Sequence, residues 1–268
     1  MIAQARRITT IPSRLISRFV PAPQYLAEDN RYAAFIARNK REIRSALRIR
    51  HEVFSVELGG DASNSSGLEY DAFDFRCSHL IVIEKATGKT VGTYRLNSFE
   101  SARSREGFYS ANEFDLSEIA DEVLAGSIEI GRACILAAHR NTKVLFLLWK
   151  ALANHLARSG KRYFFGCCSI FSTDPTVGVS AYNQLKTDGH FHEQLSVPPL
   201  QNAIDVSVSA LDQEKVELPS LFNMYLRIGA KVCGPPMIDH DFGTIDFFVI
   251  FDLRDMDKKY RKMFFGES

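Results

Sequence analysis

The sequence predicts a single mixed α/β domain, classed as α/β or α+β, in which helices flank one central and mostly antiparallel sheet. Segments that alternate like strands lie between segments with helical periodicity, and one pair of strands is joined by a hairpin-type turn. A chain of 268 residues is long enough to bury a large core. No apolar stretch reaches the roughly 18 residues that a membrane-spanning helix needs.

The N-terminal part of the chain is strongly basic. The first 50 residues carry a net charge of +8, whereas the rest carries −7. We expect residues 1–38 to be a basic leader, disordered or lying on a membrane surface, and residues 39–268 to form the domain. Arginines interleave with apolar residues between Arg6 and Val20, which suits an anionic membrane surface. We expect no nucleic-acid partner.

The first elements of the domain follow from local patterns. Residues 39–54 have helical periodicity and many arginines, and residues 57–66 have the glycine, asparagine and serine content of a loop. Residues 79–84 and 90–97 alternate like strands around a hairpin turn at residues 86–89. We expect these two strands to be antiparallel neighbours.

The second half of the chain continues the alternation of helices and strands. A short helix should end near Gly126, and Gly160 should terminate a longer one. We expect strands at residues 127–136, 161–170 and 244–253, helices at 141–158, 175–185 and 219–228, and weak patterning at 189–217. The five cysteines show no paired spacing, so a reducing compartment is expected.

Four motifs in the first half of the chain resemble those of the acyl-homoserine-lactone synthases, a branch of the GNAT superfamily that uses acyl carrier protein. They are Arg50-x-x-x-Phe54, Glu69-x-Asp71-x-x-Asp74, the run Gly-Thr-Tyr-Arg-Leu at 92–96, which contains Arg95, and Glu129-x-x-Arg132.

A longer resemblance, over about residues 48–264, is to the ornithine-lipid N-acyltransferases and their hemolysin-type relatives. It is carried by residues 108–116, 165–169 and 225–236, continuing through Asp239, Phe242 and Asp246. It implies a GNAT-like fold and an N-acyltransferase. Such an enzyme moves a long acyl chain, with or without a 3-hydroxyl group, from acyl carrier protein to the α-amine of an amino acid. Ornithine would give lyso-ornithine lipid.

Two other functions stay open. One is an acyl-homoserine-lactone-type synthase, and the other is a non-catalytic acyl-carrier or membrane-binding module. No H-x-x-x-x-D motif follows any of the seven histidines, so a separate O-acyltransferase is expected to act downstream.

Amide formation needs an acceptor for the proton of the attacking amine. We expect Glu129 to be this base, with Arg132 beside it and His79 as a second candidate. The alternatives are that Glu129 only pairs with Arg132 or Arg95, and that His79 is a core hydrogen-bonding residue.

The substrate is expected to contact the acidic residues near position 70. Glu69, Asp71 and Asp74 would bind the ammonium groups of a dibasic amino acid beside Arg95, or would form a structural network with arginines. The lactone-synthase resemblance adds Arg50 and Phe54 to this site. No histidine shares the spacing of the acids, so no metal is expected.

The acyl donor is expected near Arg140, Asn141 and Lys143, at the start of a helix. This run lacks the glycines with which GNAT acetyltransferases approach a pyrophosphate, so acyl carrier protein is favoured over acyl-CoA, with no other cofactor. Its acidic surface would suit the basic residues of 38–48. Residues 146–149, 164 and 165 would line an acyl tunnel or pack the core. We expect a cytoplasmic protein, peripheral on the inner face of the membrane.

Overall fold

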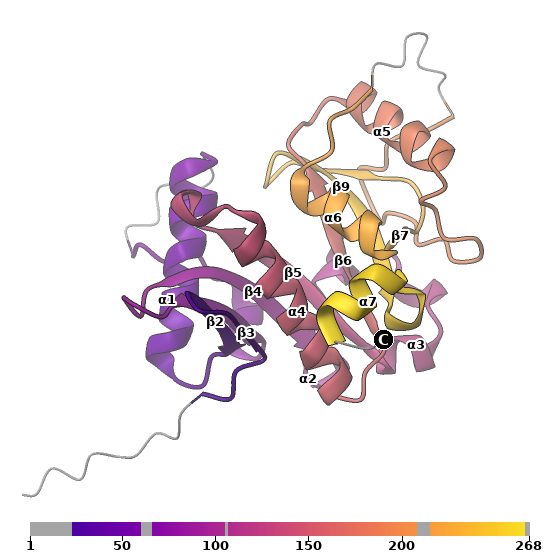
Figure 1. Ribbon diagram of the computed structural model, residues 1–268. Coiled ribbons are helices and arrows are strands. Elements are labelled where there is room, and N and C mark those ends of the chain that lie inside the picture. Colours follow the sequence, from indigo (N-terminus) through magenta and orange to yellow (C-terminus); the bar gives the residue numbers. More distant parts are fainter. Residues whose placement is uncertain (1–22, 60–65, 105–106, 208–214, 266–268) are drawn as a thin grey trace, which may run out of the picture.

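A computed structural model describes residues 23–59, 66–104, 107–207 and 215–265 (Figure 1). The predicted fold class is confirmed: strands of the described chain form one sheet in the order β1-β2-β3-β4-β5-β6-β9-β7, and β8 also pairs with β9. Neighbouring strands are antiparallel except for β5 and β6. The strands are β1 Ala27–Glu28, β2 Tyr32–Ile36, β3 Ser78–Glu84, β4 Thr90–Ser98, β5 Ser127–Ile135, β6 Tyr163–Ile170, β7 Lys231–Val232, β8 Met237–Asp239 and β9 Thr244–Asp252.

Helices cover both faces of this sheet (Figure 1). They are α1 Lys40–Arg50, α2 Phe99–Arg103, α3 Asp121–Ala125, α4 Thr142–Arg158, α5 Pro175–Thr187, α6 Ser220–Ile228 and α7 Lys258–Phe265. Successive side chains of a strand point to opposite faces. Phe164 therefore packs with the core under α4 to α7, whereas Phe165 packs on the side of α2 and α3. Among the described residues, no helix is long and apolar enough to cross a bilayer.

The predicted helix boundaries rest on capping residues that the structure contains. Asn141 accepts hydrogen bonds from the N–H groups of Lys143 and Val144, at 3.1 Å each, and thereby starts α4. Gly160, with φ +68°, follows the end of this helix. Asp174 caps α5 by accepting a hydrogen bond from the N–H group of Thr176 at 2.9 Å.

The expected leader boundary at residue 38 is wrong for its last part. Strands β1 and β2 belong to the sheet, and Ala34 pairs with Val82 of β3. Tyr32 is only 1% exposed. The sequence did not predict strand β2, because this strand is only five residues long and lies within the basic segment. The residues from Arg6 to Val20, where membrane contact was expected, lie outside the described part of the chain.

Strands β5 and β6 run side by side only briefly. Their pairing begins at Ser127 and ends with Glu129 opposite Phe165, after which β5 stays with β4 and β6 stays with β9. The two strands therefore diverge and leave backbone edges that face each other. A small pocket at this point is lined by these two strands, β9, α4 and α6, and its wall includes Ile130, Trp149 and Tyr225.

Gly166 lies where β6 leaves β5. A Cβ atom there would clash with the carbonyl oxygen of Ile130, which is backbone and cannot rotate away. We expect Gly166→Ala to lower the free energy of unfolding by about 1–3 kcal/mol, because the strands must shift to admit the methyl group. Urea unfolding monitored by fluorescence measures this.

Gly131→Ala is the matched control on β5, since a Cβ atom there meets no described atom within 4 Å. Its free energy of unfolding should be unchanged or slightly higher, because alanine restricts the unfolded chain. Equal losses in the two variants would contradict a specific close approach at Gly166.

Candidate active site

The acidic residues of the expected substrate site lie in a network of ion pairs. Arg50, at the end of α1, is fully buried and donates to the two oxygens of Asp74 at 2.6 and 3.0 Å. It also pairs with Glu69. Arg95 of β4 donates to Asp71 at 2.6 Å and lies 3.6 Å from Asp74. Each of these acids therefore has an arginine partner.

Electrostatics in this network favour the ionised forms. Burial raises the pKa of Asp74, but Arg50 outweighs that effect and leaves the pKa below its ordinary value. Burial lowers the pKa of Arg50, whereas Glu69 and Asp74 raise it well above its ordinary value. Of the two roles considered for the acids, the geometry therefore favours a structural network over an ammonium site.

Glu129 has no acceptor position left for a substrate proton. Its carboxylate accepts hydrogen bonds from the backbone N–H groups of Tyr109 and Ser110, at 2.9 and 2.7 Å. The Ser110 hydroxyl and the Asn97 amide donate to it at 2.8 and 3.1 Å. A carboxylate offers about four such positions. Its described hydrogen bonds go to neither Arg95 nor Arg132. This geometry opposes both the expected role as base and the expected arginine pairing.

Arg132 lies at a bulge in β5, where the register against β4 shifts. Its φ of 49° is in the left-handed region, which is uncommon for a residue other than glycine. The guanidinium lies between the rings of Tyr109 and Phe242, 4.8 and 4.5 Å from their centroids. It donates to Glu69 at 3.2 Å and to Asp71 at 3.4 Å. Arg132 thus joins the ion-pair network to a wall of aromatic rings.

His79 and Phe54 lie in packed surroundings. His79 is 1% exposed, and its Nε2 atom is 3.3 Å from the carbonyl oxygen of Asp74. Burial lowers its pKa, although Asp74 opposes the change. This position matches the alternative of a core histidine. Phe54 packs against an apolar cluster that contains Ile49 and Leu136.

The expected donor residues are engaged in local contacts. Arg140 pairs with Glu57, with one N–O distance of 2.6 Å. Asn141 caps α4 and so occupies the N–H groups that an anion would otherwise contact. Lys143 is exposed in the first turn of α4.

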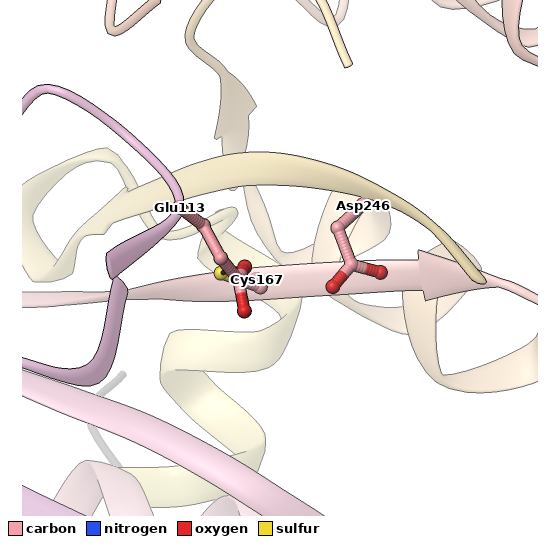
Figure 2. Close-up of side chains that lie close together, drawn as sticks. All are labelled: Glu113, Cys167 and Asp246. Carbon is pink, nitrogen blue, oxygen red and sulfur yellow. Dashed lines mark hydrogen bonds between the residues drawn. The ribbon is translucent and has the colours of Figure 1, made fainter. Parts of the chain in front are cut away.

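A second acidic cluster, which the sequence did not indicate as a site, lies near enough to Arg132 for its charge to lower the pKa of Asp246. Glu113, Cys167 of β6 and Asp246 of β9 place their ligand-type atoms within 4.8 Å of one another (Figure 2). The Cys167 thiol donates to Glu113 Oε2 at 2.9 Å. Glu113 follows the short helix η3, Tyr109–Asn112, which Glu129 fixes through its hydrogen bonds. Glu129 therefore positions the segment that carries Glu113.

The pKa of the Glu113 carboxyl group lies near neutral pH. Burial raises its pKa to about 7, and the negative charges of Asp246 and Asp239 add to the effect. Burial likewise raises the pKa of Asp246, and that of the Cys167 thiol to well above its ordinary value. A buried carboxyl group with such a pKa suits general base catalysis. On spacing alone, the cluster also resembles a metal site, which the sequence did not lead us to expect.

Comparisons of the amino-acid sequence with known proteins show to which family the chain belongs. Residues 49–150 match the acetyltransferase (GNAT) domain family. The chain is 31% identical over 250 residues to an L-ornithine N(alpha)-acyltransferase of Agrobacterium fabrum, covering 87% of this chain and 85% of the relative. It is 30% identical to the enzyme of the same name from Brucella abortus, covering 87% and 88%. The chain belongs to the L-ornithine N(alpha)-acyltransferase family.

Solved structures match the chain at lower sequence identity. The crystal structure of the AHL synthase LasI is 13% identical, with a TM-score of 0.48, and the match covers 88% of this chain and 95% of that one. FeeM, an N-acyl amino acid synthase from uncultured soil microbes, is 10% identical, with a TM-score of 0.45 and coverage of 84% and 92%.

As a member of the L-ornithine N(alpha)-acyltransferase family, the chain is an acyltransferase, and the predicted family is confirmed. Within its site, Glu113 is the buried carboxyl group whose environment fits a proton acceptor. Glu113 and Asp246 both stand in the sequence blocks that carry the family resemblance. Their proximity depends on η3 meeting β9, which no local pattern reveals.

The buried Arg50–Asp74 pair connects α1 to the segment that carries Asp71 and Asp74. We expect Asp74→Asn to lower the free energy of unfolding by about 3–5 kcal/mol, because it leaves the Arg50 charge without its bidentate partner. Chemical denaturation at neutral pH measures the loss.

Glu84→Gln serves as control, since Glu84 pairs at 2.8 Å with Arg31, whose side chain is 62% exposed. That variant should lose much less stability than Asp74→Asn, because solvent screens the exposed pair. A loss for Asp74→Asn as small as the control would mean that the network contributes little to stability.

Proposed function

We propose that this chain transfers a long acyl chain from the thioester of acyl carrier protein to the α-amine of ornithine, which gives lyso-ornithine lipid. The observation that carries the proposal is the 31% identity to an L-ornithine N(alpha)-acyltransferase over 87% of the chain. Three further relatives with the same printed name match 87–90% of the chain.

Glu113 supplies the proton acceptor for this reaction. An ammonium has no lone pair, so the Glu113 carboxylate takes a proton from the α-ammonium of the substrate. The amine nitrogen then attacks the thioester carbonyl carbon, the C–N bond forms and the C–S bond breaks. The second proton leaves the nitrogen for the departing thiolate. A pKa of about 7 lets Glu113 be ionised in a useful fraction of molecules at neutral pH.

Direct transfer fits the cysteines of this site better than an acyl-enzyme does. Burial raises the pKa of Cys77 to about 12 and that of Cys167 to well above its ordinary value. A protonated thiol is a poor nucleophile.

Acyl carrier protein fits the donor role better than acyl-CoA. Asn141 already caps the N-terminus of α4, and Arg140 is paired with Glu57, so the start of α4 offers little to a pyrophosphate. An acidic carrier would instead meet a row of exposed basic residues before and along α1: Arg38, Lys40, Arg41, Arg44 and Arg48.

We place the thioester end of the acyl chain at the small pocket where β5 and β6 diverge. Of the residues considered for an acyl tunnel, Trp149, Phe164 and Phe165 line this pocket. Leu147 and Leu148 lie in the hydrophobic core, and Phe146 packs against Phe264 of α7. The lipid product points to a protein that works in the cytoplasm, peripheral on the inner face of the membrane. A separate O-acyltransferase would add the second acyl chain.

Lipid mass spectrometry on bacterial cells that express this chain and make no ornithine lipid tests the function. We expect acylated ornithine as a new species. With purified protein, Glu113→Gln should lower kcat/KM by about 10²–10⁴-fold, since the proton acceptor is lost. In the unmodified protein kcat/KM should rise as pH increases through about 7, because Glu113 becomes ionised.

Glu118→Gln is the control, because Glu118 is an exposed carboxylate five residues further along the chain. It should keep full activity. If Glu113→Gln also kept full activity, the assignment of the base would be wrong. Acylated homoserine lactone in place of acylated ornithine would favour the synthase alternative, and the absence of any acylated amine would contradict the proposed reaction.

A further inference from the structure

The second acidic cluster carries more negative charge than its role in proton transfer requires. Besides Glu113 it contains Asp246, which is 4% exposed, and Asp239 of β8, which is 9% exposed. In the residues that the structure describes, no ion pair joins Glu113, Asp239 or Asp246 to a basic side chain within 4.0 Å. The acids at positions 69, 71 and 74, by contrast, are all paired.

One carboxylate oxygen of the cluster has no hydrogen-bond partner. Asp246 Oδ1 is buried and has no hydrogen-bond partner within 3.5 Å among the described residues, although the hydroxyls of Ser169 and Thr244 lie close enough to lower the pKa of the Asp246 carboxyl group. A buried acceptor without a donor is costly and rare in native proteins. Asp246 lies beside Glu113 and Cys167 (Figure 2), so its unpartnered oxygen belongs to the same acidic cluster. These features indicate a missing cationic donor.

We propose that Asp246, supported by Asp239, is the binding site for the side-chain ammonium of the amino-acid substrate, so that the enzyme selects a diamino acid over a neutral one. This inference rests on the proposed N-acyltransferase function. The ligand-type atoms of Glu113 and Asp246 lie within 4.8 Å of one another. That proximity suits a substrate whose two amines are joined by a short aliphatic chain, with the α-amine at Glu113 and the side-chain ammonium at Asp246.

A cationic amine explains the cluster better than a metal ion does. A metal bound at Cys167 would have to displace the thiol proton, against burial and the neighbouring carboxylates, which raise the pKa of this thiol. An ammonium group, in contrast, brings several N–H donors and one positive charge. It would satisfy Asp246 Oδ1 and balance the charge of the cluster. The rings of Tyr109 and Phe242, which both contact the Arg132 guanidinium, provide apolar surface near the cluster.

Asp239 takes part through its charge and is fixed by the backbone. Its Oδ1 atom accepts hydrogen bonds from the N–H groups of Asp241 and Phe242, at 2.9 and 3.1 Å. The turn after β8 therefore orients this carboxylate next to Asp246.

Ornithine and norvaline, which has the same carbon chain without the side-chain amine, provide the decisive comparison. With purified full-length protein and acyl carrier protein carrying a long acyl chain, we expect kcat/KM to be about 100-fold higher for ornithine, as loss of a charged hydrogen-bonding partner implies. Asp246→Asn should lower kcat/KM for ornithine by about the same factor. The effect on norvaline should be much smaller, because it comes only from the loss of a negative charge beside Glu113.

Asp241→Asn is the matched control. Asp241 is exposed and lies two residues after Asp239, so this substitution removes one negative charge outside the acidic cluster. It should keep the ornithine preference. Thermal unfolding checks that each variant folds. The comparison of the two amino acids on the unmodified protein needs no variant, so equal use of both would overturn the ammonium site even if Asp246→Asn does not fold.

The outcomes separate this inference from the proposed function. Equal use of ornithine and norvaline by the unmodified protein would overturn the ammonium site and leave N-acylation intact. Equal losses for both amino acids in Asp246→Asn would do the same. A stoichiometric metal that is present in the unmodified protein and lost in Asp246→Asn would also overturn it. Failure of the unmodified protein to acylate any amino acid would count against the proposed function itself.

Discussion

The separation of β5 from β6 immediately after Glu129 and Phe165 is the constraint on which the site depends. Two parallel strands that part in this way need something to fix the place of separation. Gly166 permits the close approach to Ile130 there, and Glu129 binds the backbone of η3 at the same level of the sheet. Because η3 leads directly to Glu113, the divergence of the strands and the position of the proposed base are set by one group of contacts.

The two acidic clusters of this protein differ in how their charge is balanced. Glu69, Asp71 and Asp74 form ion pairs with arginines from α1, β4 and β5. These pairs neutralise the charges of the acids and connect the three elements. Glu113 and Asp246 have carboxylates, a thiol and hydroxyl groups around them, and burial raises the pKa of both even though the charge of Arg132 lowers that of Asp246. The ion pairs of Arg132 are with the first cluster. Charge that is left uncompensated in a buried site is available to a cationic substrate.

Much of the fold could be predicted from the sequence because its signals are local. The hairpin of β3 and β4 and the caps of α4 and α5 depend on residues within a few positions of each other. Strand β2 was missed because Tyr32–Ile36 is short, and its burial comes from pairing with β3, more than 40 residues away in the chain. The site follows the same rule: the motif residues were recognised, but their partners come from distant segments.

Glu129 and Glu113 show why a motif cannot assign a role by itself. Both are buried glutamates in segments that carry the family resemblance, and amide formation needs one carboxylate as proton acceptor. Glu129 receives donors from Asn97, Tyr109 and Ser110, which fill its acceptor positions and tie it to the scaffold. Glu113 interacts with fewer donors, the weakly donating thiol of Cys167 and the Tyr109 hydroxyl, and it faces further negative charge. A carboxylate whose acceptor positions are filled by four scaffold donors has no free position to offer the amine, whereas desolvation beside other acids raises the pKa of Glu113. The number of donors around each carboxylate, a property of the folded chain, therefore decides which glutamate can accept the proton of the attacking amine.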